Sequence, residues 1–418
     1  MQKTFSYPKT FLLGFGFFGV SIIWSTYNAF VPIFLSQRFG LSTGIVGFFM
    51  VLDNIAGMII QPPVGAYSDR LRTRLGRRLP FILIGAPISA LAFIFIPRAQ
   101  ILPLFVASTM TLLLSMAFWR TPVIALMPDI TPSKYRSQAN GIINFMGGLG
   151  AVVSYFVGSK LYDLNPTNPF LFGAGLVLLS SVLVLLFIKE PRNYEEVPQE
   201  ATPGLIESIK LIFKEEDTSA LRILGAIFLW FVSYNAIEAF FTLYSVNHLG
   251  LGVGESAFQL TFMSLLFLLF ALPSGYIGAK FGRKRTITVG LVFLSIAILM
   301  MYFLNVNSLT TILAAVPVVG NIRIIGIILM FAGIGWALIN INSLPMVVDM
   351  TEDARVGTYT GLYYFASTLA AITGPIVFGQ LITHTHENYN LMMLVSPIFI
   401  VLAIILMSGV RKGEAKSE

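Results

Sequence analysis

The chain has 418 residues, of which 56% are hydrophobic and 11% are charged, whereas about 25% of the residues in an ordinary soluble domain are charged. This composition excludes a water-soluble globular protein, and the high hydrophobicity excludes a disordered chain. The absence of cysteine excludes disulfides, thiolate metal sites and a cysteine nucleophile. The three histidines lie at breaks between apolar runs, so we expect no metal site.

Twelve apolar stretches follow one another along the chain, each close to the length of about 20 residues that a membrane-spanning helix needs. Runs such as 176–188 are apolar on every face, which predicts helices rather than the strands of a barrel. The first stretch is longer than a signal-peptide core and is expected to be the first span. The stretches lie near residues 11–35, 43–66, 79–96, 102–127, 138–159, 170–189, 221–246, 256–279, 286–304, 322–346, 357–382 and 389–410.

One long polar stretch divides the chain almost in half. It contains three prolines and several Glu and Lys residues, so we expect a six-helix bundle at 1–189, a cytoplasmic linker at 190–220 and a second bundle at 221–418. Within the linker, residues 205–213 mix apolar and charged side chains and predict a short interfacial helix.

The basic residues are distributed unevenly between the two sides of the predicted membrane. With both termini and the linker in the cytoplasm, 22 of the 27 Lys and Arg residues lie on that side. Four others lie outside, and Arg120 lies within a span. The positive-inside rule therefore predicts cytoplasmic termini, and the net charge of +7 needs no nucleic-acid partner.

Three segments of the first half recur at the equivalent spans of the second half. Three matches in register predict a duplicated six-helix unit, as in parallel-repeat transporters with a substrate site between the halves. The pairs are Tyr27-Asn28-Ala29 with Tyr234-Asn235-Ala236, the loop Asp69-Arg70…Gly76-Arg77-Arg78 with Ala279-Lys280…Gly282-Arg283-Lys284, and Asp129-Ile130-Thr131…Arg136 with Asp349-Met350-Thr351…Arg355.

The repeated loop after spans 2 and 8 resembles the Gly-x3-Asp-Arg/Lys-x-Gly-x-Arg/Lys-Arg/Lys signature of the major facilitator superfamily, with a four-residue insertion at 71–74 in the first copy. Residues 68–82 are similar to the sucrose–proton symporters, and residues 120–141 and 361–364 resemble the glycoside–cation symporter group. The resemblance implies an all-α integral membrane protein with 12 transmembrane helices in two homologous bundles. It also implies alternating access.

Only three ionisable residues lie deep in the predicted spans: Asp53, Arg120 and Glu238. A charge inside the membrane costs several kcal/mol unless it is paired or hydrated, which marks these residues as functional candidates. One hypothesis is that Asp53 or Glu238 gains or loses a proton as substrate binds. Competition for Arg120 would then link protonation to sugar binding. The alternative is that Arg120 permanently neutralises one acid and holds helices together.

The resemblance also bears on the coupling ion. In sodium-coupled melibiose carriers, carboxylates lie one and five residues before the proline of span 2. Taking Pro62 as that proline, the corresponding residues here are Gln61 and Gly57. Sodium prefers several oxygen ligands, carboxylates among them, so we expect a proton to be the coupling ion and sodium to be less suitable. No other cofactor is expected.

Sugar sites combine hydrogen-bonding side chains with aromatic faces. The spans contain such residues, although each could instead join neighbouring helices. The substrate-binding candidates are Tyr27, Asn28, Arg120, Asn144, Tyr234, Asn235, Trp336, Asn340 and Tyr364.

The loop motifs are interpreted as inner gates. Asp69 can pair with Arg70, Arg77 or neighbouring helix ends, whereas the alternative is that basic loops simply anchor to anionic lipid. The gating candidates are Asp69, Arg70, Gly76, Arg77, Asp129, Arg136, Gly282, Arg283, Asp349 and Arg355.

The leading functional hypothesis is proton-coupled uptake of a glucoside or disaccharide across the plasma membrane by a monomer. Export of another small organic solute and sugar uniport remain alternatives. An enzyme is not expected, because no metal or phosphate motif accompanies clustered His, Asp or Lys. The sequence has no nucleotide-binding glycine loop, so ATP is not expected to drive transport.

Overall fold

The computed structural model describes residues 6–132, 135–190, 207, 212, 217–317, 319–351 and 355–414. Most of the predicted linker, and with it nearly all of the expected interfacial helix at 205–213, lies outside these residues. The predicted boundaries of the two bundles and the linker stay a prediction.

The chain forms two compact units, and each unit includes a short segment from the opposite half of the sequence. The first unit consists of Met1–Leu41, Leu52–Glu195 and Gly252–Thr261, and the second of Ser42–Val51, Glu196–Leu251 and Phe262–Glu418. The two exchanged segments open the second and the eighth predicted spans, which are equivalent positions in the sequence repeat.

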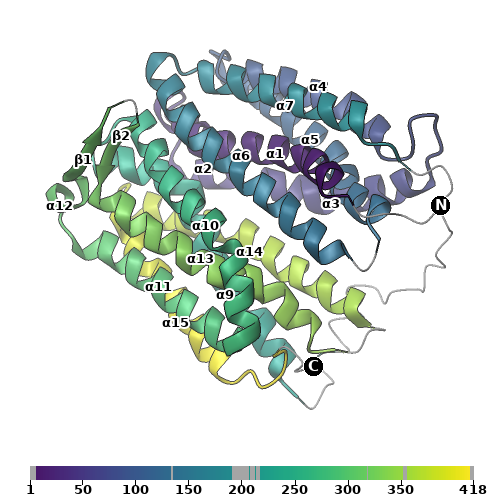
Figure 1. Ribbon diagram of the computed structural model, residues 1–418. Helices are drawn as coiled ribbons and strands as arrows, with labels where there is room; N and C mark the ends of the chain where they lie inside the picture. Colours follow the sequence, from purple (N-terminus) through teal and green to yellow (C-terminus); the bar gives the residue numbers. More distant parts are fainter. Residues whose placement is uncertain are drawn as a thin grey trace. The chain divides into compact units, whose positions relative to one another are not determined.

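The first unit is a bundle of long helices (Figure 1). Its central helix α1 packs against α5, α6 and α7, while α4 packs against α5 and α7, and α3 against α5. The elements are α1 (Tyr7–Ile33), η1 (Phe34–Arg38), α3 (Leu52–Arg70), α4 (Leu79–Phe95), α5 (Leu102–Ile130), α6 (Arg136–Leu164) and α7 (Asn168–Phe187).

Aromatic rings join four helices in the core of the first unit. Phe30 of α1 stacks on Tyr162 of α6, with ring centroids 4.6 Å apart and planes inclined by 9°. Phe170 of α7 lies 6.3 Å from Phe30 and 4.8 Å from Phe93 of α4. Phe30, Phe93 and Phe170 are fully buried, and aromatic pairs in such geometry contribute about 0.5–1.5 kcal/mol beyond their burial.

The second unit contains α9, which packs against α14 and α15, and α13, which packs against α11 and α14. A small hairpin of β1 and β2 lies next to α13 (Figure 1). The elements are α2 (Thr43–Met50), α9 (Ser219–Asn247), α10 (Val253–Phe281), α11 (Arg283–Phe303), α12 (Val306–Thr310), β1 (Ile312–Val316), β2 (Gly320–Arg323), α13 (Ile324–Val348), α14 (Val356–His384) and α15 (Asn390–Ser408); the first residues of α10 belong to the first unit.

The short helix α2 is fixed to the end of α14 by polar contacts at its N-terminus. The backbone N–H of Thr43 donates to the Glu387 carboxylate at 3.2 Å, and the Thr43 hydroxyl contacts the same carboxylate. The Thr43 and Tyr389 hydroxyls are hydrogen-bonded at 2.7 Å, and the N–H of Gly44 donates to the Thr383 hydroxyl at 2.8 Å. These contacts satisfy backbone donors that the first turn of a helix leaves without partners.

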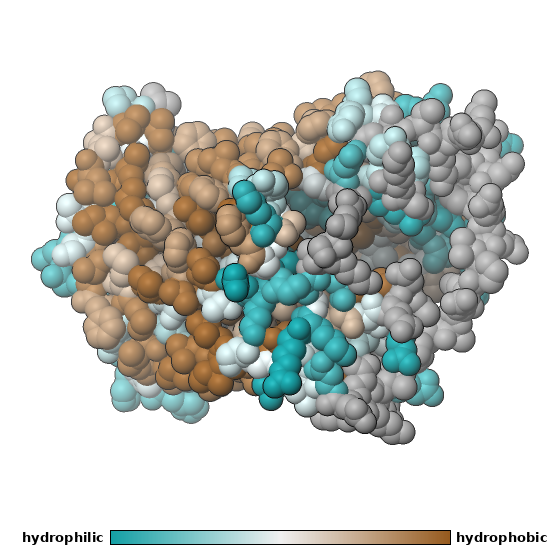
Figure 2. Space-filling view, turned by 60° about the horizontal axis from the view of Figure 1, so that its bottom comes forward, coloured by the Kyte–Doolittle hydropathy of each residue, from teal (hydrophilic) through white to brown (hydrophobic). Residues whose placement is uncertain are grey.

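The predicted helical spans are confirmed. In the described part of the chain, eleven helical segments are long and apolar enough to cross a membrane, and Leu79–Phe95 is a shorter apolar helix. The total of twelve therefore includes this shorter helix, and the side on which the termini lie stays a prediction. Figure 2 shows a broad hydrophobic face with hydrophilic residues gathered toward its edges, as expected for a surface in contact with lipid.

Two local features were not expected from the sequence. The second span is divided at Val51 into α2 and α3. The hairpin pairs Ala314 with Ile322 in an antiparallel register. All five residues of β1 are apolar and exposed, so the strand lacks the alternation that identifies a half-buried strand in a sequence.

We predict that Gly47→Ala destabilises the contact between α2 and α14. A Cβ at Gly47 would lie 2.3 Å from the Pro375 carbonyl oxygen, so one of the two backbones must move. Overpacking of this kind costs about 1–3 kcal/mol, and the thermal unfolding midpoint in detergent should fall. Gly175→Ala is the matched control, because a Cβ at this helical glycine would contact nothing within 4 Å. Equal midpoints for the two variants would contradict the prediction.

Candidate functional site

Three of the predicted site residues come together inside the first unit. Asp53 lies in the first turn of α3, and its carboxylate interacts electrostatically with Tyr27 of α1 and with Arg120 of α5. The Asn54 amide also donates to the Asp53 carboxylate at 2.8 Å. The Tyr27 hydroxyl is buried and has no hydrogen-bond partner among the described residues.

This arrangement brings one acid and one base, both partly buried, into electrostatic contact. An ionised Asp53 balances the Arg120 charge, and a proton on Asp53 leaves the guanidinium without that counter-charge. The Tyr27 hydroxyl is a buried polar group without a partner among the described residues, so it would gain by forming a hydrogen bond. The group of Tyr27, Asp53 and Arg120 is called the acid–base cluster below.

The second unit presents an aromatic group built from α9, α13 and α14. Tyr234 stacks on Trp336 with ring centroids 3.6 Å apart and planes inclined by 5°. Phe231 meets the same Trp336 edge-on at 5.3 Å and 88°, and it meets Tyr363 edge-on at 6.5 Å. The Tyr363 hydroxyl is hydrogen-bonded to Ser343 at 3.0 Å, which fixes the position of α14 against α13.

The other binding candidates of the second unit lie on the same three helices. The Asn235 amide donates to the Phe231 carbonyl at 2.7 Å, one turn earlier in α9. The backbone carbonyl of Asn340 accepts a hydrogen bond from the Ser343 hydroxyl at 3.0 Å. Tyr364 is 56% exposed, with its ring 5.4 Å from that of Tyr363. Glu238 lies one turn after Tyr234 in α9.

The last two candidates lie in the first unit. Asn28 follows Tyr27 in α1 and is partly buried. Asn144 is exposed on α6, and its amide donates to the Asn140 carbonyl of the same helix at 2.9 Å. A bond within one helix leaves the other atoms of the amide available for other contacts.

A dense network of charges joins the loop after α3 to the end of α5. Arg77 binds both carboxylate oxygens of Asp129, at 3.1 and 2.5 Å, and Arg78 binds Asp129 at 2.9 Å. Arg78 also contacts the Asp69 carboxylate and the Ser68 hydroxyl. The side chains of Arg78 and Asp129 are 5% and 10% exposed, so solvent screens this network little.

The structure thus adds Arg78 to the predicted gating residues. The sequence offered Arg70, Arg77 and helix ends as partners of Asp69, whereas the structure pairs Asp69 with Arg78. Arg70 is exposed at the end of α3. Arg136 lies at the start of α6 and donates to the Pro128 carbonyl at a distance of 3.4 Å.

The second unit contains the equivalent network. Arg283 contacts the Asp349 carboxylate and donates to the Pro345 carbonyl at 3.0 Å, as Arg77 binds Asp129 in the first unit. Lys284, the counterpart of Arg78, donates to the Ser408 and Val410 carbonyls at 2.8 and 2.7 Å. Arg355 is exposed just before α14.

Two glutamates that were not among the predicted residues hold corresponding helix N-termini. Glu190, which follows α7, accepts the N–H groups of Arg77, Arg78 and Leu79 at 2.8, 2.8 and 2.7 Å. Glu414, which follows α15, accepts those of Arg283 and Lys284 at 2.6 and 3.2 Å. A carboxylate is favourable there because a helix N-terminus carries free N–H groups and a partial positive charge.

The predicted glycines make room for these carboxylates. Gly76 and Gly282 have φ angles of 115° and 97°, a region in which a residue with a Cβ is strained. A Cβ on Gly76 would also lie 2.6 Å from the carboxyl carbon of Glu190. The common position of Glu190 and Glu414, just after the last span of each half, is the sequence signal that could have identified them.

The sequence from residue 13 to residue 329 matches the family model of the Major Facilitator Superfamily. The chain belongs to this superfamily. It is a multi-pass membrane transporter and not an enzyme. The solved structure of a mutant of the nucleoside transporter NupG is similar, with a TM-score of 0.75 and 15% identity over 96% of this chain and 100% of that chain. At this identity the likeness shows the fold alone.

The proteins related to this chain in sequence have names that refer to different transported solutes. Putative glycoside/cation symporter YagG of Escherichia coli is 24% identical over 94% of this chain and 85% of that protein. Multidrug resistance protein 2 of Bacillus subtilis is 24% identical over 70% and 72%. Sucrose transport protein SUT1 of Oryza sativa is 27% identical, but the match covers 41% of this chain and 39% of that protein.

We predict that Glu190→Ala destabilises this protein more than Glu190→Gln does. Alanine leaves three N–H groups without their acceptor, whereas glutamine retains an acceptor oxygen and loses only the charge. Loss of a helix cap costs about 0.5–2 kcal/mol, which should appear as a lower thermal unfolding midpoint. Glu414→Ala should have a smaller effect, because this carboxylate accepts from two N–H groups. Equal midpoints for Glu190→Ala and the unmodified chain would disprove the capping role.

Proposed function

We propose that this transporter takes up a glucoside or disaccharide together with a proton, by alternating access across the plasma membrane. The observation that carries the proposal is the acid–base cluster, in which the Asp53 carboxylate interacts with both Arg120 and Tyr27. A transporter coupled to protons needs a group that gains and loses a proton, placed where that change alters substrate binding. Asp53 meets both requirements.

The sugar part of the proposal rests on the aromatic group of the second unit. Tyr234 is partly buried and stacks one ring face on the buried Trp336, so its opposite face is an apolar surface of the kind that covers a sugar ring. Asn235 follows Tyr234 in α9. The match to the putative glycoside/cation symporter over 94% of the chain also supports a glycoside substrate. The shorter match to the sucrose transport protein supports a disaccharide.

The proposed coupling follows from charge balance. With Asp53 ionised, Arg120 is neutralised and has less tendency to bind a sugar hydroxyl. A proton on Asp53 removes the attraction between its carboxylate and Arg120, which favours hydrogen bonds from the guanidinium to the sugar. Proton and sugar therefore favour each other's binding, as linkage between two sites requires. Gln61 and Gly57 supply no carboxylate to a cation at this part of α3, which supports a proton over sodium.

The two networks at the helix ends are proposed to act as gates. Arg77 with Asp129, and Arg283 with Asp349, join helix ends at equivalent positions of the repeat. The side chains of Arg77 and Asp129 are 15% and 10% exposed, and breaking such a nearly buried ion pair costs several kcal/mol, enough to favour one conformation strongly. The Arg283–Asp349 pair is more exposed and should contribute less. For these pairs to act as gates, each ion pair must break and be replaced by other contacts during the transport cycle.

A second function is supported by one finding. The match to Multidrug resistance protein 2 covers 72% of that protein, so export of a small organic solute in exchange for protons is the alternative. Uniport of a sugar is the further possibility if Asp53 and Glu238 have only structural roles.

We predict that Asp53→Asn abolishes uphill uptake and retains sugar exchange. The variant chain is reconstituted in proteoliposomes and tested with a panel of radiolabelled disaccharides, with and without an imposed pH gradient. Asparagine cannot exchange a proton, so accumulation should vanish while exchange between internal and external sugar continues. Glu238→Gln is tested in parallel, and Glu207→Gln, at an exposed glutamate, is the control.

Three outcomes separate the alternatives. Accumulation by both Asp53→Asn and Glu238→Gln would disprove coupling through these acids. Sugar uptake by the unmodified chain that ignores the pH gradient would indicate a uniporter. Transport of a non-sugar solute against an opposing pH gradient, without any sugar uptake, would indicate an exporter.

We predict that Arg120→Lys loses at least about 90% of the uptake rate although it keeps the positive charge. Lysine lacks the planar fork with which arginine binds a carboxylate and a hydroxyl together. Initial rates of uptake are measured at equal amounts of inserted protein, with Arg98→Lys, at an exposed arginine, as control. An uptake rate near that of the unmodified chain would show that only the positive charge of Arg120 is needed.

A further inference from the structure

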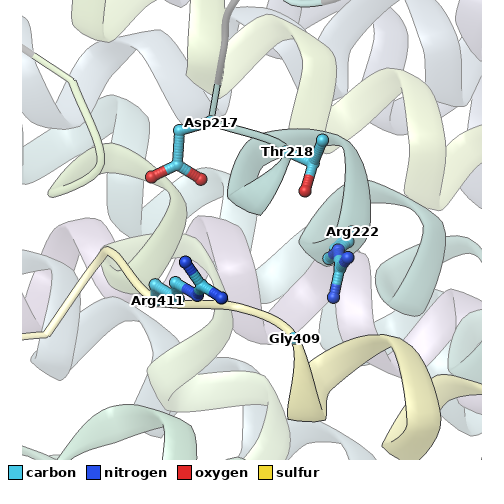
Figure 3. A pocket seen from close by; sticks show the side chains of 5 residues that line it. All are labelled: Asp217, Thr218, Arg222, Gly409 and Arg411. Atoms are coloured by element: carbon cyan, nitrogen blue, oxygen red, sulfur yellow. The ribbon is translucent and has the colours of Figure 1, made fainter.

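A polar cavity of about 350 Å³ lies within the second unit, between the start of α9 and the end of α15 (Figure 3). It is lined by Asp217, Thr218, Arg222, Gly409 and Arg411. The backbone N–H of Arg411 donates to the Ser219 hydroxyl at 2.9 Å, which fixes the segment after α15 to the first residue of α9. None of these residues belongs to the acid–base cluster, the aromatic group or the two gate networks.

Two exposed arginine side chains, those of Arg222 and Arg411, extend into this cavity. Figure 3 shows the Arg222 side chain directed toward Gly409 and the Arg411 guanidinium directed toward the space between Asp217 and Thr218. Among the described residues, neither guanidinium forms a hydrogen bond or ion pair with the protein. Arginine has five N–H donors in a rigid fork, so two such groups facing one cavity form an incomplete anion site.

Asp217 is the one carboxylate among the described lining residues, and it already has partners. Asp217 pairs with Lys412 at 3.3 Å and accepts the N–H of Ser219 at 2.7 Å. Hydrogen bonds from Ser219 lower the pKa of Asp217 to about 2, so this carboxylate is ionised at neutral pH and matched by Lys412. Among the described residues that line the cavity, the positive charges of Arg222 and Arg411 are therefore in excess.

Gly409 provides the room that Arg222 needs. A Cβ at this position would lie 1.4 Å from a terminal nitrogen of Arg222, so any larger residue would displace the guanidinium. The glycine is the C-terminal cap of α15 and has a φ of −85°, a value open to other residues. A glycine is therefore what permits this position of the Arg222 guanidinium, which a larger residue would move elsewhere on its flexible side chain.

We propose that the cavity binds a phosphate group, with the Arg222 and Arg411 guanidinium groups holding its oxygens. Phosphate oxygens match the arginine fork in charge and geometry. The cavity lies where the apolar segments of α9 and α15 end, the depth at which lipid headgroups lie, and basic pockets between such helices bind anionic headgroups. The phosphate can thus belong to an anionic phospholipid or be free in solution.

Bound phosphate would link α9 to α15 through two charge-assisted contacts. A ligand that binds only the folded protein raises its stability in proportion to RT ln(1 + [L]/Kd). The thermal unfolding midpoint of the full chain in detergent therefore reports occupancy. Three additions are compared: phosphatidylglycerol in mixed micelles, phosphatidylcholine at the same mole fraction, and inorganic phosphate at constant ionic strength.

Phosphatidylglycerol should raise the midpoint in a saturable manner, and phosphatidylcholine should not. In Arg222→Gln and Arg411→Gln, the half-saturating concentration should increase at least tenfold. Arg98→Gln, at an exposed arginine far from this cavity in the sequence, should respond like the unmodified chain. A parallel response to inorganic phosphate would identify free phosphate as a sufficient ligand, whereas a response to phosphatidylglycerol alone would identify the lipid headgroup.

The proposal is wrong if the Arg222 and Arg411 variants respond like the unmodified chain, or if sodium chloride reproduces the effect. A second measurement keeps the test decisive should either variant fold poorly. Native mass spectrometry of the unmodified chain should retain bound phosphatidylglycerol, and Gly409→Ala, which displaces Arg222 without removing a charge, should release it. Equal retention by the two proteins would also overturn the proposal.

Discussion

A lipid bilayer offers no hydrogen bonds, so every backbone and charged group of this protein must find its partners within the chain or at the membrane surface. The constraint is most severe where a helix ends, because the first N–H groups and last carbonyls have no partner in the helix. Glu190 and Glu414 meet this need with carboxylates from the other end of each half. Because their helices begin at the repeated loop motif, the same residues also position the arginines of both proposed gate networks.

The two halves show how one missing carboxylate redirects a basic side chain. In the first unit, Arg78 lies between Asp69 and Asp129. In the second unit, Ala279 occupies the position of Asp69 in the repeat. The counterpart of Arg78, Lys284, donates instead to two carbonyls at the end of α15. The first network thus consists of ion pairs. The second consists of one ion pair, Arg283 with Asp349, and of Lys284, which binds the C-terminal end of α15. A cation is favourable at a helix C-terminus.

The spans and the loop motifs could be predicted from the sequence because both are local patterns. Apolar length identifies a membrane helix, and Asp129 or Arg283 stands out within a repeated motif. Glu190 and Glu414 could not be found in this way, because a helix cap supplied from more than 100 residues away leaves no local pattern. The break at Val51 was missed for a related reason. It interrupts an apolar stretch without any Gly or Pro at the break itself.

The separate aromatic candidates were predicted, but their stacking was not. Tyr234 and Trp336 lie 102 positions apart in the sequence, and only the packing of α9 against α13 brings their rings to 3.6 Å. The acid–base cluster depended likewise on the packing of α1, α3 and α5. Sequence reasoning identified Asp53 and Arg120 by their cost in a membrane. The interaction between Asp53 and Arg120 itself was visible only in the tertiary structure.

The division of the second span gives the proposed transport cycle a physical constraint. Its first part, α2, is held on α14 by Glu387 and Thr383, whereas its second part, α3, carries Asp53 within the first unit. Alternating access requires the two units to move relative to each other. The covalent chain then permits two responses: α2 detaches from α14, or the span bends at Val51. Detachment would separate Glu387 and Thr383 from the first N–H groups of α2, whereas Glu387 is already exposed to solvent. Water can therefore replace the protein partner of this carboxylate, which lowers the free-energy cost of detaching α2 relative to a contact buried on both sides.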